Sequence, residues 1–168
     1  MVTSRSPGLH LSDVIHDMDR ELMRTERGEL DDATRLQFEK GWLWEEALSQ
    51  AFAKKGAKRI GEILEDGITM TPDGVSFDGD DFVVEEYKCT ALSADKPPTD
   101  NWKWMMQAKG YCKALGAFKC IFRVLHHMDI MWHPGRAYGT FLLTFTQREL
   151  DENWEAVVNH AKVMRGRE

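Results

Sequence analysis

The sequence has no long apolar run, since none of its hydrophobic stretches approaches the roughly 18 residues that a membrane span needs. Its first residues, MVTSRSPGLHLSD, contain no apolar segment of the secretory type. The three cysteines, Cys89, Cys112 and Cys120, form no CxxC pair and no evident disulfide framework. We therefore expect a protein of the reducing cytoplasm with no membrane partner.

Internal repeats, low-complexity tracts and an evident domain linker are also absent. The 168 residues are 42% hydrophobic and 30% charged, which is the composition of an ordered chain rather than a disordered one. A chain of this length suits one domain with one hydrophobic core.

The net charge is −6, which argues weakly against an extended surface for nucleic acid. Positive charge is nevertheless concentrated between residues 96 and 125, where Asp100 is the one acid. The bases of this segment are Lys96, Lys103, Lys109, Lys113, Lys119 and Arg123. Such a run is typical of a solvated helix face, and becomes a candidate binding surface if an acidic metal site lies beside it.

Hydrophobic periodicity, turn residues and cap residues predict four helices and at least four strands. The helices are expected from Ser12 to about Arg24, from Asp31 or Asp32 to about Lys55, from Thr99 or Asp100 to Leu115, and after a Thr146–Glu149 capping box. The strands are expected over 67–77, 82–89, 117–127 and 137–146. This order predicts an α/β fold of one domain, with a central mixed β-sheet flanked by helices.

Two acids and a lysine interrupt the predicted strand FVVEEYKCT. Alternate residues of a strand share a face, so Glu86 and Lys88 should point together while Glu85 points away. A hairpin that turns at 78–81 would bring Asp73, in TPDG, alongside Glu86. Carboxylates suit Mg²⁺, and a nearby lysine can position water or stabilise charge on a phosphate. The alternative is an exposed edge-strand pair, with Asp73 as a turn residue.

Glu45 falls inside an apolar stripe of the second predicted helix, FEKGWLWEEALSQAF. The stripe that should face the core comprises Phe38, Gly41, Leu48 and Phe52. A carboxylate in that position is costly to bury without a cation. Glu45 is therefore expected to face inward, toward either a metal or a basic side chain, whereas Glu46 should face solvent.

Gln107 and Tyr111 lie four residues apart on the third predicted helix and therefore share a face. The pair could hydrogen-bond catalytic side chains or a substrate phosphate. A buried tyrosine with a glutamine partner and no further role is the alternative.

Four motifs, in this order, resemble those of the PD-(D/E)xK nuclease superfamily, and in particular its RecB-like branch of YqaJ-like phage exonucleases and lambda exonuclease. GWLWE supplies Glu45, TPDG supplies Asp73, EEYKCT supplies Glu86 and Lys88, and QAKGY supplies Gln107 and Tyr111. The motifs cover about residues 41 to 111. The resemblance implies a restriction-endonuclease-like core over 36–168, preceded by a helical extension over 1–35.

The resemblance also implies a Mg²⁺- or Mn²⁺-dependent DNA nuclease, chiefly an exonuclease of recombination or repair in a bacterial cell or a phage-infected host. Asp73, Glu86, the Tyr87 carbonyl and Glu45 would bind metal, and Lys88 would orient or activate the attacking water. The residues expected to support the site or touch DNA are Gln107, Tyr111, Lys103 and Lys109.

The chain lacks the four cysteines that hold a cluster in some relatives, so no iron–sulfur cluster is expected. Because the chain is short and acidic, a homo-oligomer, or a recombination or single-strand-binding partner, is expected to supply further DNA contacts. A non-cleaving DNA-binding or assembly module on the same fold, and a structure-specific endonuclease, stay open as alternatives.

Several other residues invite a second interpretation. His126, His127 and His133 lie in HHMDIMWH, which lacks strong zinc-ligand spacing. Trp102, Trp104 and Trp132 could stack on bases, although core packing is expected for at least one of them. Cys89 points away from Lys88 and is expected to be a packed thiol.

Overall fold

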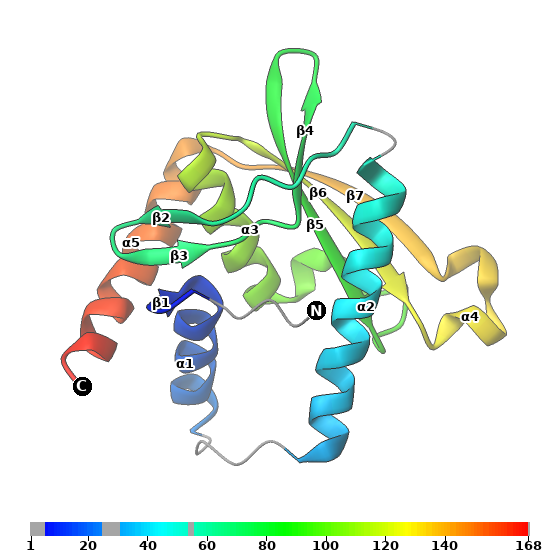
Figure 1. Ribbon diagram of the computed structural model, residues 1–168, viewed down its shortest axis with the longest axis horizontal. Coiled ribbons are helices and arrows are strands. Elements are labelled where there is room, and N and C mark those ends of the chain that lie inside the picture. The colour runs from blue at the N-terminus through cyan, green and yellow to red at the C-terminus, as the bar shows by residue number, and fades with distance from the viewer. Residues whose placement is uncertain (1–5, 25–30, 54–55, 168) are drawn as a thin grey trace.

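A mixed β-sheet forms the centre of the computed structural model, which describes residues 6–24, 31–53 and 56–167 (Figure 1). Its strands lie in the order β4 (Gly74–Asp78), β5 (Asp81–Thr90), β6 (Lys119–His126) and β7 (Tyr138–Thr144). The β5–β6 pair is parallel, and the two outer pairs are antiparallel. The predicted α/β class with a central mixed sheet is confirmed.

A second, smaller sheet contains β1 (Leu9–His10), β3 (Ile68–Met70) and β2 (Ile63–Glu65), in that order. The single strand predicted over 67–77 is therefore wrong, because β3 belongs to the small sheet and β4 to the large one. Pro72 lies between them, and a proline has no N–H for a strand ladder. The break places Asp73 immediately before the first residue of β4.

Three long helices cover one face of the large sheet: α1 (Leu11–Met23), α3 (Trp102–Leu115) and α5 (Gln147–Arg165). α3 contacts β5 and β6, while α1 and α5 pack against α3 and each other (Figure 1). β6 alternates between buried and partly exposed residues, and its buried side chains join the main core. A period of two is what a half-covered strand requires.

Two helix starts differ from the prediction. α1 begins at Leu11 and not at Ser12, because His10 and Asp13 form a capping box at its start. α3 begins after Asn101, whose side chain accepts a hydrogen bond from the Trp104 amide, and not after Thr99 or Asp100. Three short helices were not predicted as separate elements: η1 (Pro98–Asp100) precedes α3, while α4 (Asp129–Trp132) and η2 (Pro134–Arg136) lie between β6 and β7.

Two other caps agree with the prediction. Gly116 ends α3 with a φ of 64°, in the left-handed region that glycine adopts without strain. Thr146 and Glu149 form the predicted capping box of α5.

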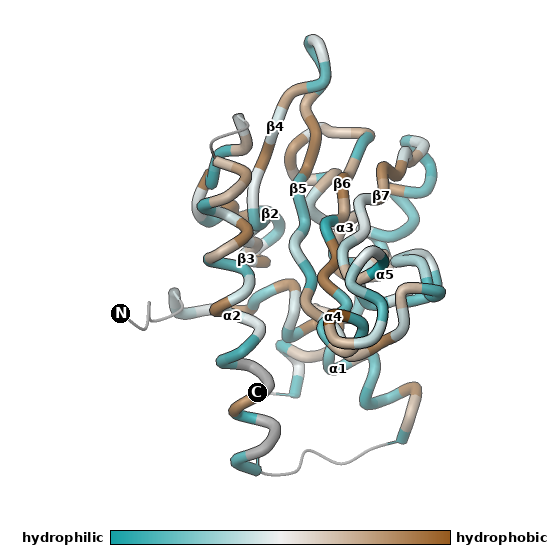
Figure 2. Tube along the Cα trace, turned by 90° about the vertical axis from the view of Figure 1, so that its right-hand side faces the viewer, coloured by the Kyte–Doolittle hydropathy of each residue, from teal (hydrophilic) through white to brown (hydrophobic). Residues whose placement is uncertain are grey.

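α2 (Asp32–Ala53) lies on the other side of β5 from α1 and α5, as Figures 1 and 2 both show. β4 pairs with β5 only as far as Glu85, and α2 contacts β5. Phe52 anchors the helix, since its ring lies 5.9 Å from that of Tyr87 in a small second core. The predicted helix end at Lys55 and the side chain of Phe38 lie outside the described part of the chain.

The proposed division into an extension, 1–35, and a core, 36–168, stays a prediction. α1 itself packs into the main core, where Leu11, Val14 and Ile15 are buried. Among the described residues, no helix combines the length and the apolar character that crossing a membrane would require.

Candidate active site

Asp73 lies beside Glu86, as the predicted hairpin requires. β4 and β5 pair with Gly74 opposite Glu85, so the preceding residue, Asp73, comes next to Glu86 in the same register. Its Oδ2 accepts a 2.6 Å hydrogen bond from the backbone N–H of Tyr87. This bond ties the carboxylate to β5 directly after the break at Pro72.

A chain of contacts joins β5 to α3. Lys88 Nζ contacts Glu86 Oε1 and donates a 2.9 Å hydrogen bond to Gln107 Oε1. Gln107 Nε2 in turn donates a 2.7 Å hydrogen bond to the Tyr111 hydroxyl. The lysine ammonium is therefore held between a carboxylate and an amide oxygen, with its side chain 17% exposed. The middle of β5, where these polar residues lie, is teal between more apolar segments in Figure 2.

One oxygen of Glu86 has no partner. Within the described part of the chain, Oε2 is buried without a hydrogen bond, and the residue is 1% exposed. An unsatisfied buried carboxylate oxygen is costly, and cation binding would remove that cost. Together with Asp73 it offers two hard oxygen ligands of the kind Mg²⁺ prefers, so the residues present fit a divalent cation.

The electrostatics of the three groups agree with this interpretation. Burial raises the pKa of Asp73 well above its usual value, and the neighbouring Glu86 charge raises it further. Burial also raises the pKa of Glu86, against the opposing effect of Lys88. For Lys88, burial lowers the pKa, but the Glu86 and Asp73 carboxylates outweigh burial and the net pKa is raised. Two carboxylates therefore share one ammonium. When all three groups are ionised their net charge is negative, and a bound cation would neutralise it.

Glu45 lies at the rim of the site. Its side chain is 36% exposed, and its Oε1 accepts a 3.1 Å hydrogen bond from Arg59. Arg59 also pairs with the exposed Glu46 at 3.1 Å and donates to Ser49 Oγ at 3.2 Å. Of the two partners left open by the sequence, the structure therefore contains a basic side chain, and Glu46 faces solvent as expected.

A cavity of about 490 Å³ brings these side chains together. The predicted residues that line it are Glu45, Asp73, Glu86, Tyr87, Lys88, Gln107 and Tyr111. His10, Trp42, Glu62 and Thr69 also line it, although no motif singled them out. Trp42 is three residues before Glu45, a helical spacing that could have indicated it. His10 and Thr69 come from the small sheet, which the sequence did not predict.

Glu85 takes no part in this cavity. It points to the opposite face of β5 and binds Arg123 through both oxygens, at 2.6 and 3.0 Å. Ser76 Oγ donates a further 2.8 Å hydrogen bond, and the Arg123 guanidinium lies 3.8 Å from the centre of the Phe52 ring. The prediction that the pleat removes Glu85 from the site is confirmed, and its role is to hold a buried ion pair beneath α2.

Most bases of the 96–125 segment are already paired with acids. Lys103 contacts Asp19 at 2.8 Å, and Lys109 lies 4.0 Å from Glu149. Lys113, Lys119 and Arg123 also have acidic partners. Within the described residues, Lys96 is the member of the segment whose ammonium has no ion-pair partner. The local positive charge is thus largely neutralised by the fold.

Two histidines of HHMDIMWH, His126 and His127, contact different groups. His126 Nδ1 lies 2.9 Å from the Leu92 carbonyl, and His127 Nε2 lies 3.1 Å from Lys40 Nζ. Neither belongs to a metal-type cluster among the described residues. Cys89 is half-buried near His127, and burial raises the pKa of its thiol, which agrees with a packed thiol.

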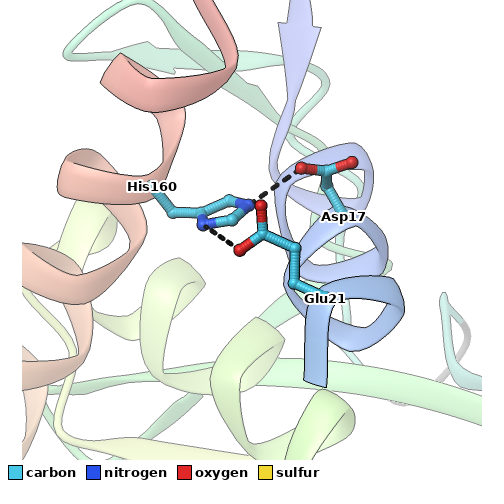
Figure 3. A group of neighbouring side chains, drawn as sticks. All are labelled: Asp17, Glu21 and His160. Carbon is cyan, nitrogen blue, oxygen red and sulfur yellow. Dashed lines mark hydrogen bonds and ion pairs between the residues drawn. The ribbon is translucent and has the colours of Figure 1, made fainter. Parts of the chain in front are cut away.

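A different cluster of metal-type ligands lies between α1 and α5, where His160 meets Asp17 and Glu21 (Figure 3). His160 Nε2 is 3.0 Å from Asp17, and Nδ1 is 3.9 Å from Glu21. Arg20 and Arg167 contact the same carboxylates. Because two guanidinium groups already balance the two acids, the cluster is an ion-pair network that joins the two helices.

Comparison with known proteins supports the fold. No family model matches this chain, and neither does any curated protein sequence. Among solved structures, LHK-Exo, an alkaline exonuclease from Laribacter hongkongensis, is 16% identical in its complex with dAMP, with a TM-score of 0.62 over 95% of this chain and 89% of that one. A phage-related exonuclease from Haemophilus somnus 129PT is 13% identical, with a TM-score of 0.55 over 89% of this chain and 78% of that one. The chain therefore shares the fold of these exonucleases.

Proposed function

We propose that this chain is a divalent-metal-dependent DNA nuclease of the PD-(D/E)xK type, and an exonuclease of the RecB-like, phage-type branch. The observation that carries the proposal is the buried, unpartnered Oε2 of Glu86 beside Asp73, with Lys88 fixed in the same cavity. The shared fold with proteins that are named exonucleases supports the choice of reaction.

The proposed metal ligands are Asp73, Glu86 and the Tyr87 carbonyl, with Glu45 ligating directly or through water. When bound, Mg²⁺ or Mn²⁺ would supply charge stabilisation for the phosphate and a more acidic water. Tyr87 has a positioning role in addition, because its N–H holds Asp73 in place at 2.6 Å.

Lys88 is proposed to act as an ammonium. Its nitrogen faces Glu86 Oε1 and Gln107 Oε1, which are both acceptors, so it donates to both. In that form it can orient the attacking water and stabilise the charge that develops on the phosphate as the P–O bond breaks. Gln107 would hold the lysine in position, and Tyr111 would hold Gln107.

A comparison of linear and circular DNA tests this function. We expect wild-type protein with Mg²⁺ to shorten end-labelled linear DNA and to leave closed circles intact. Lys88→Ala should reduce the cleavage rate by about a hundredfold or more, since removal of one charge-stabilising donor has effects of that size. Circular dichroism should show the same helix content in both proteins.

The other outcomes separate the alternatives. Cleavage of closed circles would indicate an endonuclease, because an endonuclease needs no end. Wild-type protein that binds DNA but leaves single-stranded, double-stranded and structured substrates intact with either metal would indicate a non-cleaving module. Cleavage that persists at the wild-type rate in Lys88→Ala would contradict the assigned site. Homo-oligomerisation, a recombination partner and the cytoplasmic location stay predictions.

A further inference from the structure

A second cavity, of about 320 Å³, lies next to the Lys88 site. We call it the tryptophan pocket, and the residues of its wall that matter here are Thr90, Lys96, Trp102, Lys103, Trp104 and His126. Its volume lies at the lower end of the roughly 300–1,000 Å³ that is usual for small-ligand sites.

The tryptophan pocket opens on the same face of the sheet as Glu86 and Lys88. Thr90 follows Lys88 by two residues on β5, so it shares that face at a distance of roughly 7 Å. Trp104 precedes Gln107 by three residues on α3, which is about one helical turn. The step from the Lys88 site into the pocket is therefore comparable with the length of one nucleotide.

His126 lines this pocket and carries an unpartnered nitrogen. The residue is 2% exposed and pairs with Thr90 in the β5–β6 ladder. Its Nδ1 faces the Leu92 carbonyl at 2.9 Å, so Nδ1 carries the proton in that bond. Nε2 is buried and has no hydrogen-bond partner within the described part of the chain. A neutral ring in this tautomer presents Nε2 as an acceptor, which needs a ligand that donates.

The aromatic residues provide a surface for a flat ligand. Trp104 has one partner already, because its ring stacks on Phe122 with the centroids 6.4 Å apart and the planes at 24°. Trp102 is half-buried and has no aromatic partner among the described residues. A nucleobase can stack on such a ring regardless of its sequence, and every base carries an N–H donor at its edge.

The charges of the pocket argue against a site for phosphate alone. Its wall contains Asp19 and Asp100 as well as Lys96 and Lys103, so the four formal charges cancel. Lys103 is moreover paired with Asp19 at 2.8 Å. An anion gains little from such a wall, whereas an uncharged base gains from the stacking surface and the Nε2 acceptor.

We propose that the tryptophan pocket binds the nucleobase of the nucleotide next to the cleaved phosphate, with the base on Trp102 and an N–H of the base donating to His126 Nε2. This inference rests on the proposed function for its biological meaning, but the binding itself does not need cleavage. It assigns to this chain a base-binding subsite that is separate from the metal ligands.

Equilibrium binding of dAMP and deoxyribose 5-phosphate, measured by calorimetry in EDTA, tests the subsite. The two probes share the sugar and the phosphate and differ by the base. We expect dAMP to bind at least about tenfold more tightly, and Trp102→Ala to remove most of that difference. The control is Trp132→Ala on α4, whose ring is 73% exposed outside the pocket and whose loss should change nothing.

Equal affinity for the two probes, or full dAMP affinity in Trp102→Ala, would overturn the subsite. If Trp102→Ala does not fold, NMR of the wild-type protein with dAMP tests the subsite instead. The resonances of the Trp102 indole N–H and of His126 Nε2 should then move on addition of dAMP, and unmoved resonances would overturn the proposal. A protein that binds the base but cuts no DNA would contradict the nuclease and keep the subsite. A protein that cuts DNA but shows no affinity for the base would contradict the subsite and keep the proposed nuclease function.

Discussion

The backbone N–H of Tyr87 donates a 2.6 Å hydrogen bond to Asp73, which fixes the first acid of the site against the strand that carries the second acid and the lysine. Asp73 follows Pro72, where the chain leaves the small sheet for the large one. The site is thus built where two sheets meet. Glu86 is buried, Asp73 is partly buried, and the Lys88 ammonium contacts Glu86.

The first prediction concerns the stability of metal-free protein. Asp73→Asn removes one of two neighbouring carboxylates whose pKa values are raised by burial. We expect the variant to be more stable in EDTA by about 1 kcal/mol, which corresponds to roughly 2–4 °C in Tm for a chain of this size. It should also lose cleavage activity. Thermal unfolding in EDTA measures the change in stability. A lower Tm in the variant than in wild type would show that the Asp73 carboxylate stabilises the metal-free protein.

The second prediction concerns pH. A carboxyl whose pKa is raised by folding stabilises the folded state at low pH, and this contribution is lost as the pH rises through the folded-state pKa. For Asp73 and Glu86 the shifts have this direction. The stability advantage of Asp73→Asn in EDTA should therefore be larger at about pH 8 than at about pH 5. Denaturant unfolding at both values measures it, and an advantage that shrinks toward pH 8 would contradict the sign of the shift.

Mg²⁺ should reverse the order of stability of wild type and Asp73→Asn, so that wild type has the higher Tm. A ligand that binds only the folded state stabilises it in proportion to the logarithm of its concentration. Wild-type Tm should rise with Mg²⁺, whereas Asp73→Asn should respond little because it has lost a proposed ligand. Parallel titration curves for the two proteins would indicate that the cation binds elsewhere.

The third prediction concerns Arg59, which shares its guanidinium between Glu45 and Glu46. Its side chain is 49% exposed, so these pairs should contribute at most about 1 kcal/mol to stability. Arg59→Ala leaves Glu45 unpaired at the rim of the cavity and removes a positive charge near the proposed metal site. We expect a given rise in Tm to need about two- to tenfold less Mg²⁺ than in wild type, on the basis of roughly 1 kcal/mol of charge interaction.

The control for Arg59 is Arg136→Ala, which breaks an exposed pair with Asp95 and should leave the Mg²⁺ titration unchanged. The measurement uses Tm without DNA, so that any contact of Arg59 with a phosphate has no influence. A higher Mg²⁺ requirement in Arg59→Ala would show that the arginine helps the cation to bind, for example by orienting Glu45.

The fourth prediction concerns the buried pair of Glu85 and Arg123. Arg123→Leu leaves a carboxylate that is 1% exposed without its bidentate partner. Loss of one member of a buried pair typically costs 3–5 kcal/mol, so we expect destabilisation by about that amount. Glu85→Leu combined with Arg123→Leu should recover most of it. Denaturant unfolding measures the free energies. If the double variant is as unstable as Arg123→Leu, the destabilisation comes from lost packing of Arg123 against Phe52 and not from the unpaired carboxylate.

The composition and local patterns of the sequence were sufficient for much of this description. A period of two in FVVEEYKCT placed Glu86 and Lys88 on one face of β5 and Glu85 on the other, because alternation in a strand is a local property. The Thr146–Glu149 box and the Gly116 stop are local for the same reason. The register of the β4–β5 hairpin followed from its short turn, which is why Asp73 could be matched with Glu86.

Only the tertiary structure decided what each charge meets. The pattern could aim Glu45 at one side of its helix, but it could not show that Arg59, which lies on a separate segment 14 residues later, pairs with it. It could count the bases from Lys96 to Arg123, but not show that acids from distant elements neutralise nearly all of them. The split of 67–77 into two sheets and the presence of His126 and Trp102 in the wall of one cavity also depend on long-range packing. Backbone geometry is set by neighbours in the chain, whereas pairing, burial and the unpartnered oxygen of Glu86 are set by neighbours in space.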